Sequence, residues 1–147
     1  MFRKQFLPAS VILYSIFLLS GSVIAEVNSV FISSTLDPNA IIITEVDLIF
    51  IYDAETADNL PSTKSAWYSN KRKFTSDAGD KMDVVNIFVP QGFDSEMVSL
   101  PLRRADALKV AVYAYHDDSK VAPRDITGTA NVLVEIDPFG IRVSSRD

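Results

Sequence analysis

A serine stands where this sequence comes nearest to a known chemical motif. Leu19-Ser20-Gly21-Ser22 follows a basic start, Arg3 and Lys4, and an apolar run over 11–19. In a bacterial lipoprotein signal the fourth residue of this motif is a cysteine, whose thiolate takes up the diacylglycerol. A serine hydroxyl has no comparable ionised fraction near neutral pH. Ser22 therefore holds the lipidation-equivalent position, and we predict that it is not acylated.

The same segment predicts export. Its apolar run is shorter than the roughly 20 residues that span a membrane, and its basic start and small closing residues are typical of a signal peptide. Cleavage after Ala25 would make 1–25 the signal and 26–147 a single domain, whereas cleavage after Gly21 would leave Ser22 first. An ordinary signal and a lipoprotein signal that has lost its cysteine both fit these residues.

Few other residues have the chemistry of a catalytic or metal site. His116 is the single histidine, Asp117 and Asp118 follow it, and cysteine is absent. A hydrolase triad on a nucleophile elbow would need a Gly-x-Ser-x-Gly turn, which the sequence lacks, and a metal needs several ligands in one place. We interpret His116 as a solvated turn residue. The acids over 77–83 lack the spacing of a calcium loop. We expect no enzymatic activity, no metal and no cofactor.

Three groups have side chains suited to binding a ligand. Lys71-Arg72-Lys73 is interpreted as the basic end of a helix, where positive charge complements the helix dipole. Trp67, the single tryptophan, is interpreted as an anchor in the core. Tyr113 and Tyr115 alternate on one strand, and an exposed pair would suit a carbohydrate, although packing in the core is expected for at least one of them.

Charge and length limit the classes of partner. The chain has 147 residues, with 14 basic and 19 acidic side chains and a formal charge of −5. This balance argues against nucleic-acid binding, which needs a basic footprint, and against docking on anionic lipid. The length suits one domain that buries its own core without disulfides.

Alternating apolar residues predict mainly strands. Strands are expected at 27–34, 41–52, 84–89, 97–102, 107–116, 129–136 and 141–144. A helix is expected over 62–73, with Leu60, Trp67 and Phe74 forming a stripe that lies on a sheet, and a loop over 75–81. These elements predict an all-β fold with a short helical insertion, an antiparallel two-sheet β-sandwich.

The ordered set of motifs resembles the small outer-membrane lipoprotein of the type VI secretion membrane complex, the TssJ-like family. The similar segments cover most of 26–147 and begin in the signal. They are Leu19-Ser20-Gly21, Leu36-Asp37-Pro38-Asn39, 47–52 with Trp67-Tyr68, 88–92, 108–117 and 131–143.

The resemblance implies a transthyretin-like sandwich at the periplasmic face of the outer membrane. It implies a non-catalytic structural subunit that links that membrane to the periplasmic part of a TssM-like inner-membrane protein, with no small-molecule substrate. The partner-binding residues it implies are Leu36, Asp37, Pro38, Asn39 and Ala40. Relatives with the cysteine carry a lipid anchor; with Ser22 native, this chain would be soluble in the periplasm. The alternative is a periplasmic ligand- or carbohydrate-binding sandwich.

Overall fold

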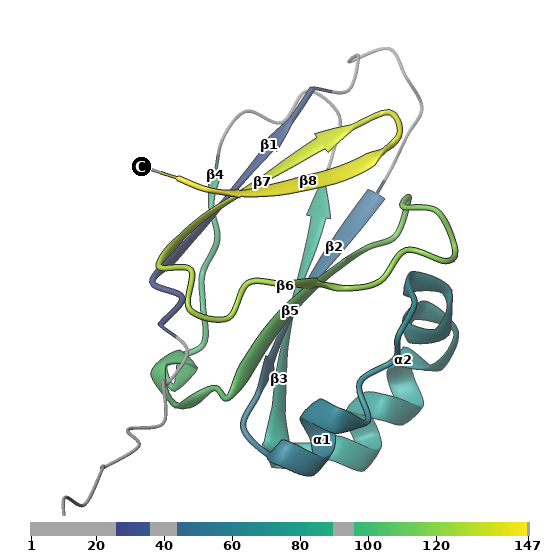
Figure 1. Ribbon diagram of the computed structural model, residues 1–147, viewed down its shortest axis with the longest axis vertical. Helices are drawn as coiled ribbons and strands as arrows, with labels where there is room; N and C mark the ends of the chain where they lie inside the picture. Colours follow the sequence, from purple (N-terminus) through teal and green to yellow (C-terminus); the bar gives the residue numbers. More distant parts are fainter. Residues whose placement is uncertain (1–25, 36–43, 90–95, 147) are drawn as a thin grey trace, which may run out of the picture.

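The computed structural model describes residues 26–35, 44–89 and 96–146. Two four-stranded sheets face each other (Figure 1). The first sheet has the order β4 (Glu96–Met97), β1 (Ser29–Ser34), β7 (Asn131–Asp137), β8 (Gly140–Ser145). The second has the order β3 (Met82–Val89), β2 (Thr44–Ile51), β5 (Lys109–Ala114), β6 (Arg124–Asp125). The expected two-sheet β-sandwich is confirmed.

One strand pair differs from the antiparallel pattern that was expected. β1 and β7 run parallel, with Val30 opposite Val132 and Ile32 opposite Val134. A tight turn forces neighbouring strands to run antiparallel, but strands so far apart in the chain are free of that constraint. The β7–β8 hairpin has such a turn, in which the Asp137 carboxylate accepts the backbone N–H of Phe139 at 2.8 Å and of Gly140 at 3.0 Å.

The main core lies between the sheets. Alternate residues of the two central strands of the second sheet point into it, as their sequence pattern predicts. They meet alternate residues of β1 and β7, and all of these side chains are buried. The buried set from these four strands is Val30, Ile32, Val46, Leu48, Phe50, Val110, Val112, Ala114, Val132, Val134 and Ile136.

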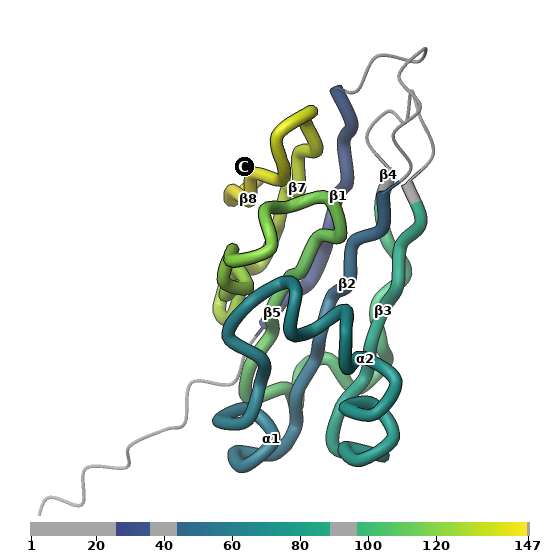
Figure 2. The backbone as a smooth tube through the Cα atoms, turned by 90° about the vertical axis from the view of Figure 1, so that its right-hand side faces the viewer, coloured from purple at the N-terminus to yellow at the C-terminus, as the bar shows by residue number. Residues whose placement is uncertain are grey.

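Two helices cover the outer face of the second sheet (Figure 2). α1 spans Ala54–Asp58, and α2 spans Lys64–Ala78. Beneath them, Ile49 and Ile51 of β2 form a second buried cluster with Trp67, and Leu60 and Phe74 pack against it. The predicted stripe of Leu60, Trp67 and Phe74 is therefore confirmed.

The prediction of a loop over 75–81 is wrong. The Thr75 hydroxyl donates to the Lys71 carbonyl at 2.9 Å, and Lys73 pairs with Asp77 four residues on. These contacts support helical turns that the polar sequence did not suggest. α2 ends at Gly79, whose φ of 55° is one that glycine adopts at little cost, and a short 3-10 turn follows at Gly79–Lys81.

The prediction of a strand over 97–102 is also wrong beyond its first residue. β4 stops at Met97, and a 3-10 turn (η2) occupies Arg104–Asp106. The Val98 N–H still donates to the Val30 carbonyl of β1 at 2.9 Å, and three residues later Pro101 has no N–H to donate to a neighbouring strand. The first sheet therefore has only a two-residue strand at this edge.

Candidate interaction surface

His116 joins the two sheets at one end of the sandwich. Its Nε2 lies 2.7 Å from the carbonyl oxygen of Asp137, at the end of β7, and its Nδ1 lies 2.9 Å from the Thr44 hydroxyl, at the start of β2. A carbonyl oxygen only accepts, so Nε2 carries a proton and donates. The interpretation of His116 as a solvated turn residue is wrong, because both ring nitrogens hold neighbouring strands.

Asp117 makes a second connection between the sheets. The residue is 5% exposed, and its carboxylate accepts the backbone N–H of Ile141 at 3.0 Å and pairs with the Arg124 guanidinium. Arg124 in turn donates from Nη2 to the Ile141 carbonyl at 2.9 Å. The Asp117 carboxylate and the Arg124 guanidinium therefore hold the segment after β5 against the start of β8. The sequence did not suggest this role for either residue.

A third polar cluster fastens α2 to the second sheet. The Asp47 carboxylate is fully buried on the face beneath the helix. It accepts from Trp67 Nε1 at 2.8 Å, from Lys71 Nζ at 2.9 Å and from Asn86 Nδ2 at 2.7 Å. Trp67 also stacks on Tyr113 with 5.1 Å between ring centroids, which confirms it as a core anchor. Lys71 lies inside α2 and not at its end, so that interpretation of the basic run is wrong.

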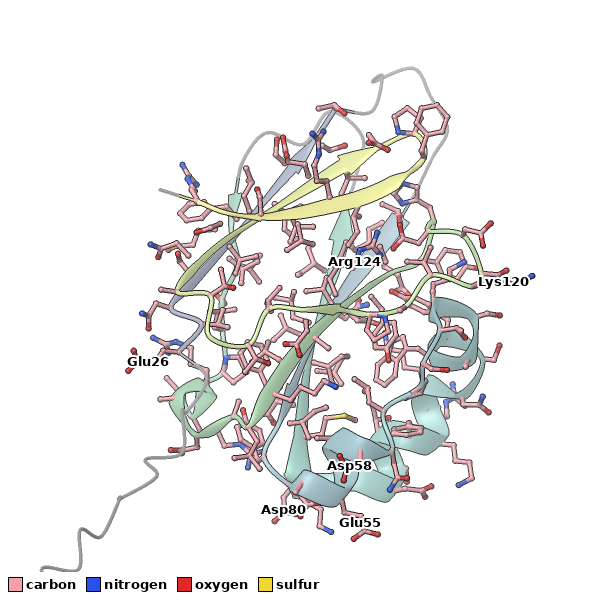
Figure 3. The ribbon with its side chains drawn as sticks, viewed as in Figure 1. Glu26, Glu55, Asp58, Asp80, Lys120 and Arg124 are labelled. Carbon is pink, nitrogen blue, oxygen red and sulfur yellow. The ribbon has the colours of Figure 1, made fainter. Side chains whose placement is uncertain are left out.

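Two of the three acids over 77–83, Asp77 and Asp83, have separate basic partners. Asp83 accepts from the Arg103 guanidinium at 2.9 and 3.0 Å and from the Tyr52 hydroxyl at 2.8 Å. The Arg103 hydrogen bond is the main reason that the pKa of Asp83 lies below its usual range. Asp77 pairs with Lys73, and Asp80 lies with Glu55 and Asp58 at the end of the molecule that carries α1 (Figure 3). In the described ranges, no three acidic or histidine side chains are placed to hold a metal ion.

These buried polar groups hold elements together. Within the described parts of the chain, every buried side-chain nitrogen or oxygen has a hydrogen-bond partner. A buried polar atom without a partner costs about 1–3 kcal/mol, so satisfied clusters of this kind are what a rigid scaffold requires.

Four exposed apolar side chains lie at or next to the ends of β3, β4, β5 and β7. Phe88 and Met97, 62% and 65% exposed, line one hollow, and Phe88 and Tyr115 line another. Phe139, 91% exposed, forms the tip of the β7–β8 turn beside Asp137. We call Phe88, Met97, Tyr115 and Phe139 the apical surface. Rings and methionines of this kind are enriched in protein–protein interfaces.

The predicted partner-binding residues lie outside the described residues. These are Leu36, Asp37, Pro38, Asn39 and Ala40, and Ser22 is outside them as well. The described chain stops at Thr35, whose N–H donates to the Ile136 carbonyl, and resumes at Thr44, which bonds to His116. Thr44 lines a hollow together with Phe88 and Tyr115, and Thr35 bonds next to Asp137, which caps the turn that carries Phe139.

The two tyrosines that suggested a carbohydrate platform are separated by the fold. Tyr113 is 1% exposed beneath α2, and its hydroxyl donates to the Pro61 carbonyl. Tyr115 is 52% exposed and meets the Tyr68 ring edge-on at 5.1 Å. Burial of Tyr113 confirms that one ring packs in the core, and the paired platform does not form.

No protein-family model matches the chain, and no curated protein matches its sequence. Its fold is similar to that of the T6SS lipoprotein TssJ1 from Pseudomonas aeruginosa, with a TM-score of 0.55, 6% identity, and coverage of 84% of this chain and 98% of that chain. It is also similar to Serratia marcescens Lip, a membrane-bound component of the Type VI Secretion System, with a TM-score of 0.51, 12% identity, and coverage of 84% and 99%. The transthyretin-like sandwich expected from the sequence is confirmed.

Over the ranges that the structure describes, the helices are too short or too polar to cross a membrane.

Proposed function

We propose that this chain is a non-catalytic structural subunit of a type VI secretion membrane complex, of the TssJ-like family. The observation that carries the proposal is the sandwich that it shares with two lipoproteins of that system, which it covers over 98% and 99% of their lengths. The ordered sequence motifs support the same family independently of the fold, because they depend only on the types and order of the residues. The buried polar clusters favour a scaffold with a binding surface.

The partner that we propose is the periplasmic part of a TssM-like inner-membrane protein. The contact is made by Leu36, Asp37, Pro38, Asn39 and Ala40, and of the flanking residues Thr44 lines a hollow with Phe88 and Tyr115 of the apical surface. The rings and the methionine of the apical surface add exposed apolar area that is open to a partner. Burying such area contributes about 25 cal/mol per Å², so this surface adds to the contact.

The proposed location is the periplasm, at the face of the outer membrane. Each acyl chain of a lipoprotein anchor contributes about 0.8 kcal/mol per buried methylene, and two chains together hold a protein stably on a membrane. With Ser22 in place of the lipidated cysteine, this chain lacks that tether, and its position depends on its protein partner. The partner is thus the main determinant of where the subunit resides.

Deleting the gene in its host and measuring effector delivery to neighbouring cells tests the proposal. Delivery should be lost and should return when the wild-type chain is supplied. A chain with 36–40 replaced by glycine and serine should accumulate normally but fail to restore delivery. A matched control, Glu55→Ala with Asp58→Ala on α1, should restore it. Normal delivery by the deletion strain would contradict the proposal.

A further inference from the structure

The outer edge of β3 presents backbone groups without partners among the described residues. β3 is the terminal strand of its sheet (Figure 2). The Tyr52 N–H donates to the Lys81 carbonyl, so Tyr52 faces β3, and the Tyr115 N–H donates to the Glu45 carbonyl, so Glu45 faces β5, both at 2.9 Å. Backbone groups alternate in direction along an antiparallel ladder.

The register then divides the residues of β3 into two sets. Asp83, Val85 and Ile87 lie opposite Phe50, Leu48 and Val46, and their N–H and C=O groups point at β2. The N–H and C=O groups of Val84, Asn86 and Phe88 point away from the sheet. This edge therefore offers evenly spaced donors and acceptors, the arrangement to which an added strand binds.

A hollow runs beside this edge, between β3 and β4. It measures about 400 Å³ and is lined by the side chains of Ile32, Val85, Ile87, Met97 and Val98 among others. Natural edge strands are usually protected by a lysine, a proline or a bulge. Over 82–89 the sequence has neither a lysine nor a proline, and the register with β2 is continuous.

Glu45 gives the edge a chemical preference. Its carboxylate accepts from Asn86 Nδ2 at 3.0 Å and, among the described residues, has no cation within ion-pair distance. Asp47, two residues along on the same face, has Lys71. Phe88 and Tyr115 flank Glu45 and line a hollow of about 200 Å³ with it. The Lys64 ammonium already lies over the Tyr115 ring, 5.0 Å from its centroid, so a further cation is attracted here by the charge of Glu45 and by the exposed Phe88 ring.

We infer that the edge of β3 is the docking site for an extended segment of a partner protein, with a lysine or arginine of that segment over Glu45, between Phe88 and Tyr115. Backbone hydrogen bonds to Val84, Asn86 and Phe88 supply affinity, and the cation supplies specificity. The site does not include residues 36–40 but shares Phe88 and Tyr115 with the apical surface, and the inference does not depend on the secretion assignment.

A second copy of this chain fits the edge less well. Two-fold pairing of β3 with itself, with outward groups meeting outward groups, places Met82 or Val84 of the second copy opposite Phe88. Both side chains are neutral, so Glu45 would stay without a cation. Two chains with a formal charge of −5 also repel each other. The charge pattern favours a basic segment.

Amide hydrogen exchange tests the open edge directly. In the free protein, the amides of Val84, Asn86 and Phe88 should exchange quickly, while those of Val85 and Ile87 should be protected by β2. A short peptide of alternating valine and threonine with one central lysine, added to about 1 mM, should slow exchange at the outward set alone. Protection of the outward amides in the free protein, or no slowing with the peptide, would overturn the inference.

Matched peptides and variants test the cation. A peptide with glutamate in place of the lysine should bind about tenfold more weakly, and Glu45→Gln should abolish that difference. Phe88→Pro, which removes an outward N–H at an edge where proline is tolerated, should weaken the lysine peptide more than Phe88→Ala does. Equal binding of the two peptides would refute the inference. A dimer of the wild-type protein in analytical sedimentation that becomes a monomer in Phe88→Pro would also refute it.

Discussion

The indole nitrogen of Trp67 donates to the carboxylate of Asp47 across 2.8 Å, and both side chains are fully buried. Trp67 belongs to α2, and Asp47 belongs to the central strand β2. This hydrogen bond therefore fixes the helical layer on the second sheet. The same carboxylate also accepts hydrogen bonds from Lys71, whose charge is opposite to its own, and from Asn86.

Asp47→Ala should destabilise the protein by about 3–5 kcal/mol, because it leaves the Lys71 cation and the Trp67 donor without their partner. Urea unfolding followed by tryptophan fluorescence measures the loss. Lys73→Ala, which removes an exposed pair with Asp77, should cost no more than about 0.5 kcal/mol. Similar losses for the two variants would mean that Asp47 does not hold α2.

Gly140→Ala should destabilise the protein more than Gly128→Ala does. Both glycines have positive φ, 153° and 80°, but only at Gly140 would an added Cβ clash with the Asp117 carboxylate. That carboxylate is held by Arg124 and Ile141, so it cannot move away cheaply. We expect about 1–3 kcal/mol for Gly140→Ala, measured as the shift in the urea midpoint. Equal losses of stability in the two variants would show that the Asp117 side chain moves aside at little cost.

Acid unfolding should depend on Asp83. The Arg103 hydrogen bond lowers the pKa of Asp83 in the folded state below the ordinary value of 3.8. The unfolded chain therefore binds this proton first, and the contribution is present above about pH 3.8 and is lost as the pH falls towards the folded pKa. Asp83→Asn should flatten the fall of stability with pH in this window, and Asp58→Asn on α1 serves as the matched control. An unchanged slope in Asp83→Asn would contradict the assignment.

Ser22→Cys should convert the chain into a lipoprotein if the signal is of that class. Labelled palmitate should appear on the variant, and the protein should move to the outer-membrane fraction, because the thiolate supplies the missing nucleophile. Wild-type protein should take up no label. Absence of label on Ser22→Cys would identify 1–25 as an ordinary signal, and label on the wild type would refute the argument from serine chemistry.

Sequence periodicity predicted the layers of the fold well. The alternation through Val46, Leu48 and Phe50 placed one face of β2 in the core, and the recurrence of Leu60, Trp67 and Phe74 placed one stripe of the insertion on the sheet. In each case burial requires a regular spacing of apolar residues, and that spacing is visible along the chain.

The misjudged features depend on partners distant in sequence. His116 bonds to Thr44 and Asp137, and Asp117 bonds to Ile141, so local composition around 116–118 suggested only solvated acids. The parallel pairing of β1 with β7 has the same origin. The open edge of β3 follows from which strand lies last in the sheet, and no local pattern encodes strand order.

The central claim is that this sandwich binds a protein partner through residues 36–40 together with the apical surface. Isothermal titration of the purified protein with the periplasmic domain of the TssM-like protein from the same host measures this directly. We predict saturable one-to-one binding that is lost when 36–40 are replaced by glycine and serine and kept in Glu55→Ala with Asp58→Ala. No heat of binding at any tested temperature, with both proteins folded, would contradict the account.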